Sequence, residues 1–281
     1  MESLAHCLSW NPVEIFCFFD DLTRLVFPHL GSGIGRKRTL TLAETATISI
    51  LKSKYGIVQL KQLYSLLSDK FVDEFTLPCY KNFVETMNAS TPHLLFLIQI
   101  MLAMRNKNAG IIKLTDSTSI PVCKNIRIPS HKVMKRLATR SKTTTGWFYG
   151  LKLHVVTDEY GNLLKFMFTT GNVDDRKALD KFLDMLQNSL IIADAGYVSR
   201  ALGNKARKRN NLLLTCVRNT MKKIATPLHI FLLNKRINVE HLFSILKDRY
   251  GLITSLPRSE LGYFAHYVRT LFAYLYMPRV S

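Results

Sequence analysis

Two short apolar segments each lead directly to a lone aspartate: Ile111–Leu114 is followed by Asp116, and Leu190–Ala193 by Asp194. Runs of this length and composition are typical of inner β-strands. In open α/β sheets, reactive groups gather at the carboxyl ends of such strands. The pattern therefore predicts a sheet in which each aspartate lies just past the end of its strand.

The segments around these strands complete an α/β pattern. Tyr149–Thr157 alternates as a strand, Asp158–Gly161 has the composition of a hairpin turn, and Leu163–Thr169 is the partner strand. A further strand is expected at 212–217, and helices are expected at 174–186, 198–209, 236–249 and 260–275. Residues 106–281 are therefore expected to form one α/β domain.

Residues 1–105 are expected to be all-helical. Thr41 and Glu44 form a capping-box pattern that opens one helix, and Gly56 ends its apolar stripe. The segment Pro78–Asn88 is either the recognition helix of a helix-turn-helix DNA-binding domain or an ordinary helix of a bundle. The longest apolar run, Leu94–Met104, is shorter than the roughly 20 residues of a membrane span, so a buried helix and no membrane partner are expected.

The charge is concentrated in the second part of the chain. The net charge is +19, yet residues 1–104 carry nine basic and nine acidic residues, and residues 105–281 carry thirty and eleven. Such asymmetry indicates a nucleic-acid surface, with a solvated basic face as the alternative. The five cysteines are scattered without a CxxC pair, which supports neither a zinc site nor a disulfide framework.

Three acids are isolated among these cations. From Arg105 to Thr157 there are eleven Lys and Arg but one acid, Asp116, and from Ala195 to Lys247 there are eleven with Glu240 alone. Carboxylate oxygens suit Mg²⁺ or Mn²⁺, and two such ions can activate an attacking oxygen and stabilise a leaving one in phosphoryl transfer. We therefore predict a metal site of Asp116, Asp194 and Glu240; taken singly, each acid could instead be a turn or cap residue.

Two basic features accompany the acids. On a helix at 236–249, Arg236, Glu240 and Lys247 fall within about 40° of one another, so both cations could hold a phosphate beside the metal. An ion pair between Arg236 and Glu240 on a solvated face is the alternative. The segment 117–146 has no acid and is predicted to be a basic arm on DNA, or else a flexible loop. Its cations are Lys124, Arg127, Lys132, Lys135, Arg136, Arg140 and Lys142.

Several segments together resemble the bacterial insertion-sequence transposases of the DDE class. They are LTDSTS (114–119), GWFYGLKLHVVTD (146–158), TTGNVDDRKAL (169–179), IIADAGYVS (191–199) and RINVEHLFSILK (236–247). The last has the Arg, Glu and Lys spacing of the Tyr-Arg-Glu-Lys signature, with Leu233 at the Tyr position. The resemblance covers residues from about 40 to 275.

The resemblance implies a ribonuclease-H-like mixed sheet flanked by helices and an Asp-Asp-Glu triad that binds two Mg²⁺ (or Mn²⁺) ions. It implies cleavage of double-stranded DNA at transposon ends and strand transfer into target DNA, by a homodimer or larger synaptic complex on the bacterial nucleoid in the cytoplasm. Asp175 in the GNVDDR motif is expected either to support the site or to cap a helix. Two alternatives remain: a catalytically silent DNA-binding protein, and a structure-selective nuclease of the same fold.

Overall fold

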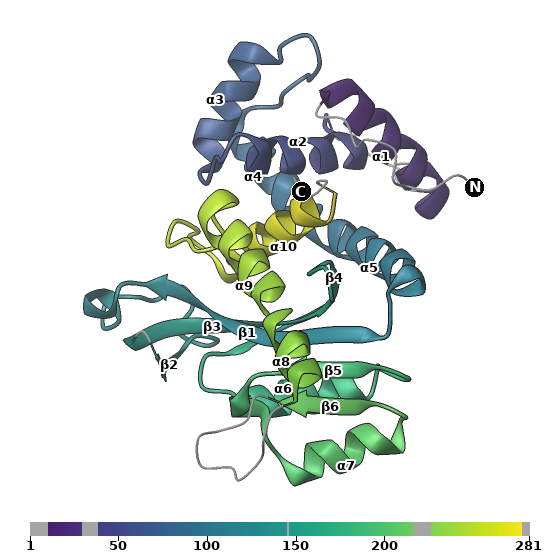
Figure 1. Cartoon of the computed structure of the whole chain (residues 1–281). Helices are drawn as coiled ribbons and strands as arrows, with labels where there is room; N and C mark the ends of the chain where they lie inside the picture. The colour runs from purple at the N-terminus through teal and green to yellow at the C-terminus, as the bar shows by residue number, and fades with distance from the viewer. Residues whose placement is uncertain (1–10, 30–38, 145, 216–225, 277–281) are drawn as a thin grey trace. The chain divides into compact units, whose positions relative to one another are not determined.

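The computed structural model describes residues 11–29, 39–144, 146–215 and 226–276, which divide into two compact units. The helical unit comprises residues 1–100 and 246–281, and the sheet unit comprises residues 101–245. Figure 1 labels the α-helices and the β-strands, and all elements follow here in chain order, with η for the shorter helical turns. They are α1 (Pro12–Val26), α2 (Leu42–Lys54), α3 (Leu60–Lys70), α4 (Tyr80–Ala89), α5 (Thr91–Asn108), β1 (Ile112–Cys123), η1 (Asn125–Arg127), β2 (Thr139–Thr143), β3 (Gly146–Asp158), β4 (Leu163–Thr170), α6 (Asp175–Leu183), β5 (Leu190–Ala193), η2 (Ala195–Tyr197), α7 (Arg200–Lys208), β6 (Leu212–Thr215), α8 (Pro227–Asn234), α9 (Ile237–Ser244), η3 (Ile245–Arg249) and α10 (Glu260–Tyr276).

Both ends of the sequence build the helical unit. α2 begins with the predicted capping box: the Thr41 hydroxyl accepts from the Glu44 N–H at 3.2 Å, and the Glu44 carboxylate accepts from the Thr41 N–H at 2.6 Å. α10 packs on α2, and the rings of Phe272 and Phe19 lie 5.1 Å apart in the core. The last helix therefore completes the apolar core of the N-terminal helices.

The boundary between the units differs from the predicted division between residues 105 and 106. Residues 246–281 lie with the helices of residues 1–100 and not with the sheet. The reason is the composition of α10, which is buried continuously from Ala265 to Tyr276. A helix that is buried on all its sides must be covered all round, and in this unit α2 and α4 contribute to that cover.

The sheet unit contains a mixed sheet with the strand order β2-β3-β1-β5-β6, in which β4 also pairs with β3. β3 is antiparallel to both of its partners β1 and β4, whereas β5 runs parallel to β1 and to β6. The predicted hairpin joins β3 to β4, and the Asp158 carboxylate accepts from the backbone N–H groups of Tyr160 and Asn162. Close pairing of β1 and β3 requires Gly150, since a Cβ at this position would clash with the backbone carbonyl of Ile120.

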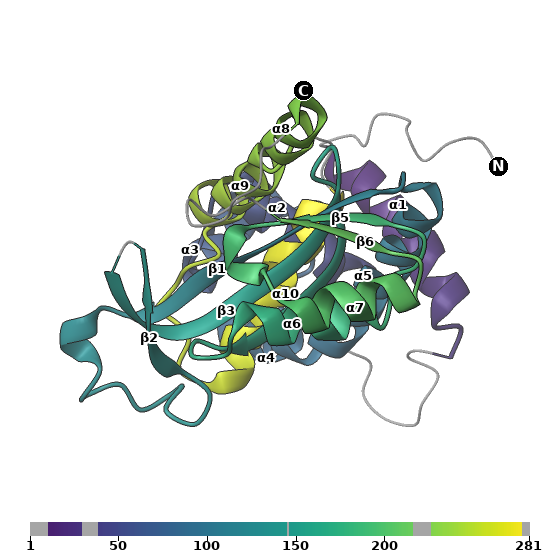
Figure 2. The same ribbon diagram turned by 60° about the horizontal axis from the view of Figure 1, so that its bottom comes forward.

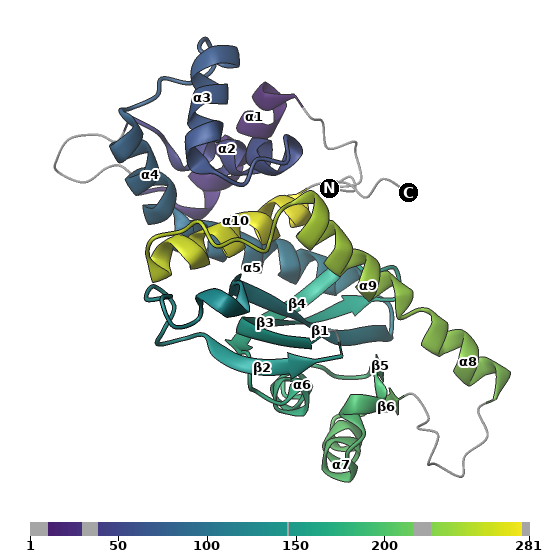
Figure 3. The same cartoon turned by 90° about the vertical axis from the view of Figure 1, so that its left-hand side faces the viewer.

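Helices cover the sheet on both faces. Figure 2 shows α6 and α7 side by side, and Phe182 and Leu202 from these helices share a core with Ile191 of β5. α9 contacts β1, and Figure 3 shows it on the side of the sheet opposite α6 and α7. The α/β architecture expected from the sequence is therefore present in this unit.

Within the described residues, no single helix is long and apolar enough to cross a membrane; α4 and α5, bent by 41°, meet the length and composition test only as a pair.

Candidate active site

Asp116 lies inside a strand, not just past the end of one. β1 continues from Ile112 through Asp116 to Cys123, so the predicted strand end is wrong for this residue. The antiparallel partner β3 pairs with β1 along this whole length and keeps it extended. Asp194, in contrast, directly follows β5 as predicted.

The parallel pairing of β1 with β5 places the two aspartates next to each other. The register aligns Ile112 with Leu190 and Leu114 with Ile192. Asp116 in β1 and Asp194 after β5 each lie two residues beyond this last pair, at the same end of the pairing. Neighbouring strands lie about 4.8 Å apart, so two carboxylates at these positions repel each other unless a cation lies between them.

That cation is Arg236, which precedes α9. Its Nη2 lies 3.2 Å from Asp116 Oδ2, and its Nη1 lies 3.2 Å from Asp194 Oδ1. The Asp116 side chain is 21% exposed and the Asp194 side chain 51%, so the pair lies at the rim of the unit. Glu159 fixes the segment that carries Arg236: its carboxylate pairs with Lys235 at 2.7 Å, and its backbone carbonyl accepts from Asn238 at 2.7 Å.

The surroundings of Asp116 oppose its negative charge despite the arginine. Burial raises the pKa of Asp116 above its ordinary value, and the negative charge of Asp194 adds to this effect. The backbone N–H of Ser117, 2.8 Å from Oδ1, and the Arg236 guanidinium act in the opposite direction without cancelling it. The two carboxylates therefore form a site with an affinity for positive charge.

Glu240 is not gathered with the two aspartates in this structure. It is an exposed residue in the first turn of α9, whose buried side is formed by Val239, Leu242 and Phe243. Among the described residues, no three His, Cys, Asp or Glu side chains form a group that could hold a metal ion. Glu240 lies on a helix, as the sequence predicts. Its role as a third metal ligand stays a prediction.

The predicted helix at 236–249 is not one α-helix. α9 ends at Ser244, and a π-helical turn follows over Ile245–Arg249. Because π-turns bond i to i+5, the count of 100° per residue does not extend unchanged to Lys247, and its place on the same face as Glu240 stays a prediction. Lys247 also belongs to the helical unit, and burial lowers its pKa.

Asp175 is tied to β3. The cap of α6 is Asp174, which accepts from the Arg176 N–H at 2.9 Å, while Asp175 pairs with Lys152 at 2.9 Å. His154 Nδ1 lies 3.8 Å from the same carboxylate oxygen. Asp175 is therefore anchored to β3 rather than acting as the helix cap.

Sequence reasoning missed three side chains around this acid. Lys152 and His154 are two residues apart in β3, so the strand period could have placed them on one face. Tyr197 follows Asp194 in η2, and burial together with the charges of Asp116 and Asp175 raises its pKa. The negative charges of Asp116 and Asp175 therefore both disfavour ionisation of Tyr197.

The basic segment 117–146 is structured and is not a loop throughout. Residues up to Cys123 belong to β1, and Thr139–Thr143 form β2. Between them, the buried side chains of Met134 and Ala138 anchor the irregular part. All seven cations predicted to contact DNA from this segment are exposed: Lys124, Arg127, Lys132, Lys135, Arg136, Arg140 and Lys142. Arg140 lies 4.9 Å over the half-exposed ring of Trp147.

Comparison with known proteins identifies a family. The family model described as "Transposase DDE domain" matches residues 105–259, more than half of the chain. The matched range includes Asp116, Asp194 and Glu240. Among curated proteins, none matches the chain.

Solved structures give the fold. A piggyBac transposase synaptic complex with hairpin DNA has 11% identity and a TM-score of 0.51, over 95% of this chain and 74% of that chain. A Mos1 transposase paired-end complex with the left transposon end has 12% identity and a TM-score of 0.25, over 92% and 84%. A Mos1 mariner paired end complex with Mn has 13% identity and a TM-score of 0.28, over 94% and 87%. The piggyBac likeness confirms the predicted ribonuclease-H-like mixed sheet with helices and N-terminal helices.

Proposed function

The chain belongs to the family of transposases with a DDE domain, and we propose that it cleaves DNA at the ends of an insertion sequence and joins the freed ends to target DNA. Asp116, Asp194 and Glu240 are the proposed catalytic acids. The observation that carries the proposal is that Asp116 in β1 and Asp194, directly after the parallel neighbouring strand β5, contact the same positive group. This arrangement concentrates carboxylate oxygens where a dication would be favoured.

The donor set fits Mg²⁺ or Mn²⁺ by its chemistry. The two aspartates supply oxygen ligands, and the position of Arg236 shows that both accept a common cation. Asp116 and Asp194 would hold the metal, with Glu240 as the third ligand. When bound, two such ions supply Lewis-acid activation of the attacking oxygen and stabilise the leaving one.

The remaining residues bind and orient the substrate. Arg236 is a cation beside the acids, able to turn to a DNA phosphate when a metal takes its place. The exposed lysines and arginines of 124–142 would track the backbone, and Trp147 beside Arg140 offers a flat apolar surface next to them. Joining two ends in one reaction requires both in one complex, so a homodimer or larger synaptic assembly is part of the proposal.

A second candidate is a DNA-binding protein of this family without catalysis. It is favoured by one observation: Arg236 already satisfies both aspartates, and Glu240 stands apart from them. A nuclease that cuts without joining is distinguished only by its products.

The test uses a labelled duplex that carries the short inverted repeats expected just outside the gene. Asp116→Asn, Asp194→Asn and Glu240→Gln should each lower cleavage in Mg²⁺ at least about 100-fold while DNA binding stays nearly intact. Asp184→Asn is the matched control, because Asp184 pairs with Lys205 on the surface of the same unit. Near-normal cleavage by one variant removes that residue from the ligand set. Absence of cleavage by the wild type favours the silent candidate, and cleavage without joined products favours the nuclease.

A further inference from the structure

The helical unit contains a cavity of about 700 Å³ that the proposed chemistry does not use. The cavity is bordered by the end of α2, the first turn of α3, one face of α4, the segment before α10, and α10 itself. Its volume is in the range of pockets that bind small molecules. All residues that line it belong to residues 1–100 or 246–281, so it is a feature of this unit alone.

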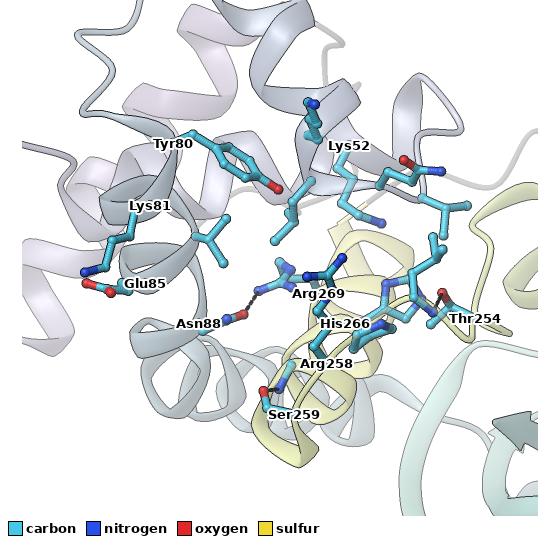
Figure 4. A pocket seen from close by; sticks show the side chains of 18 residues that line it. Lys52, Tyr80, Lys81, Glu85, Asn88, Thr254, Arg258, Ser259, His266 and Arg269 are labelled. Carbon is cyan, nitrogen blue, oxygen red and sulfur yellow. Dashed lines mark hydrogen bonds between the residues drawn. The ribbon is translucent and has the colours of Figure 1, made fainter. Parts of the chain in front are cut away.

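Two buried cations lie at the inner end of this cavity. Lys52 on α2 is 1% exposed and Arg269 on α10 is 2% exposed. Figure 4 shows both side chains converging with His266 inside the pocket. Two like charges repel each other strongly when they are shielded from water, so two buried cations at one place require a group that compensates their charge.

No carboxylate in the described part of the chain offsets these cations. Burial lowers the pKa of Lys52 to about 7, with the charge of Arg269 as the second cause, and burial alone lowers the pKa of Arg269 to about 10. No acid contributes to either shift. His266 stays neutral, because burial holds its pKa well below the ordinary value, and its Nε2 lies 2.8 Å from the Gly251 carbonyl.

The hydrogen bonds of the two cations are incomplete. Arg269 Nη1 donates to the Met87 carbonyl at 2.9 Å, but its buried Nε has no partner among the described residues. Within the same residues, no hydrogen bond or ion pair of the Lys52 ammonium is found. Buried donors of this kind are normally satisfied, so their donor capacity points to a bound acceptor.

The rim of the cavity adds further positive character. Lys61, Lys81 and Arg258 line it, against the single carboxylate of Glu85. The first turns of α3 and α4 also border it, and neither helix has a side-chain cap. Uncapped first turns leave backbone N–H groups free to bind an anion.

We propose that this cavity is a phosphate-binding site in which the side chains of Lys52 and Arg269 contact the phosphate oxygens. A tetrahedral oxyanion accepts from several donors at once, which suits two cations and the N–H groups of a helix turn better than a planar carboxylate does. The phosphate could come from a free small molecule or from a DNA backbone. The remaining volume and the apolar side chains of Val58, Val84 and Leu256 leave room for the group that carries it.

Thermal unfolding of the full chain tests the site, with inorganic phosphate replacing chloride at constant ionic strength. Lys52→Met removes the ammonium but keeps the length of the side chain. Lys54→Met, on the same helix but outside the cavity lining, is the matched control. Phosphate should stabilise the wild type and Lys54→Met. Its affinity for Lys52→Met should be lower than its affinity for the wild type by a factor of about ten or more. Without phosphate, Lys52→Met should be at least as stable as the wild type, because a desolvated charge is removed.

A second arm separates the two sources. ³¹P resonances of the bound phosphate are followed while a short DNA duplex is added to the wild type. Displacement by the duplex assigns the site to a backbone phosphate, and retention assigns it to a free small molecule. The proposal is overturned if neither phosphate nor duplex binding distinguishes Lys52→Met from Lys54→Met. Because the readout is binding, the outcome is independent of whether the acids of the sheet unit are catalytic.

Discussion

Arg236 donates to Asp116 and Asp194 at once, so its guanidinium offsets the repulsion between the carboxylate in β1 and the carboxylate directly after β5. The same oxygens are the proposed metal ligands. A metal ion and Arg236 would therefore compete for them.

We expect Arg236→Met to lower the stability of the sheet unit in EDTA by on the order of 1 kcal/mol, since Asp194 is half exposed and partly solvated. Mg²⁺ should then stabilise this variant more than it stabilises the wild type, as judged by thermal unfolding with and without the ion. Lys235→Met, which removes the neighbouring pair with Glu159, is the control. Equal stabilisation of all three proteins by Mg²⁺ would show that the aspartates do not take the metal in place of the arginine.

His154 should make the sheet unit sensitive to acid. Burial lowers its pKa to about 4, below the ordinary value of 6.5. Between these pH values the unfolded chain binds a proton that the folded chain excludes, so stability is complete above pH 6.5 and falls as the pH approaches 4. The slope contributed by one such group is on the order of 1 kcal/mol per pH unit.

Urea unfolding between pH 7 and 5 measures this slope. His154→Gln should flatten it, and the exposed His241→Gln should leave it unchanged. The alternative result, an unchanged slope for His154→Gln, would assign the acid sensitivity to other groups.

At this scale the sequence predicts the acids but not their partners. Asp116, Asp194 and Glu240 are isolated among cations, and this isolation is visible in the printed chain. The offset of four residues suggests that Arg236 pairs with Glu240, whereas the ion pairs seen run to residues 42 and 120 positions away. Local spacing contains no information on such distant partners, which depend on strand register.

Among the secondary-structure elements, β1 and β3 form the longest pairing of the sheet, and one glycine permits it. Gly150→Ala should destabilise the sheet unit by about 2 kcal/mol or more, because the new methyl group meets the rigid backbone of Ile120 and Pro121. Gly203→Ala in α7 is the opposite case: nothing lies within 4 Å of its added Cβ, so a gain of about 0.5–1 kcal/mol is expected. Chemical denaturation of both variants checks the contrast; similar effects of the two would contradict the close approach of the strands.

Elements with local signals were predicted from the sequence, and elements defined by tertiary pairing were not. The capping box of α2 and the turn between β3 and β4 depend on neighbouring residues, and both are present. The sequence predicts that β1 ends at Asp116, because the apolar segment Ile111–Leu114 stops there. Pairing with β3 on one side carries the strand on to Cys123. The π-turn after Ser244 likewise has no sequence signal in a pattern read at one fixed period.

For the whole molecule, the discontinuous helical unit predicts how fragments behave. Residues 1–105 lack α10 and so expose apolar side chains such as Phe19 that Phe272 covers in the full chain. This fragment should bind a hydrophobic dye and unfold without cooperativity. A polypeptide of residues 246–281 supplied in trans should restore a cooperative transition, measured by circular dichroism. A fragment 1–105 that folds cooperatively alone would show that α10 is dispensable for this core.

The discontinuity also sets an order of events on the ribosome. The sheet unit is complete once residue 245 has been made, but the helical unit must wait for residues 246–281. That interval lasts a few seconds at about 5–20 residues per second. During it the N-terminal helices lack α10, and their apolar side chains are exposed to aggregation. A premature stop codon after position 245 would leave Asp116, Asp194 and Glu240 encoded and the sheet intact. The resulting protein would lose its helical core, so a gene copy can decay at its 3′ end while the codons of all three proposed catalytic acids are still intact.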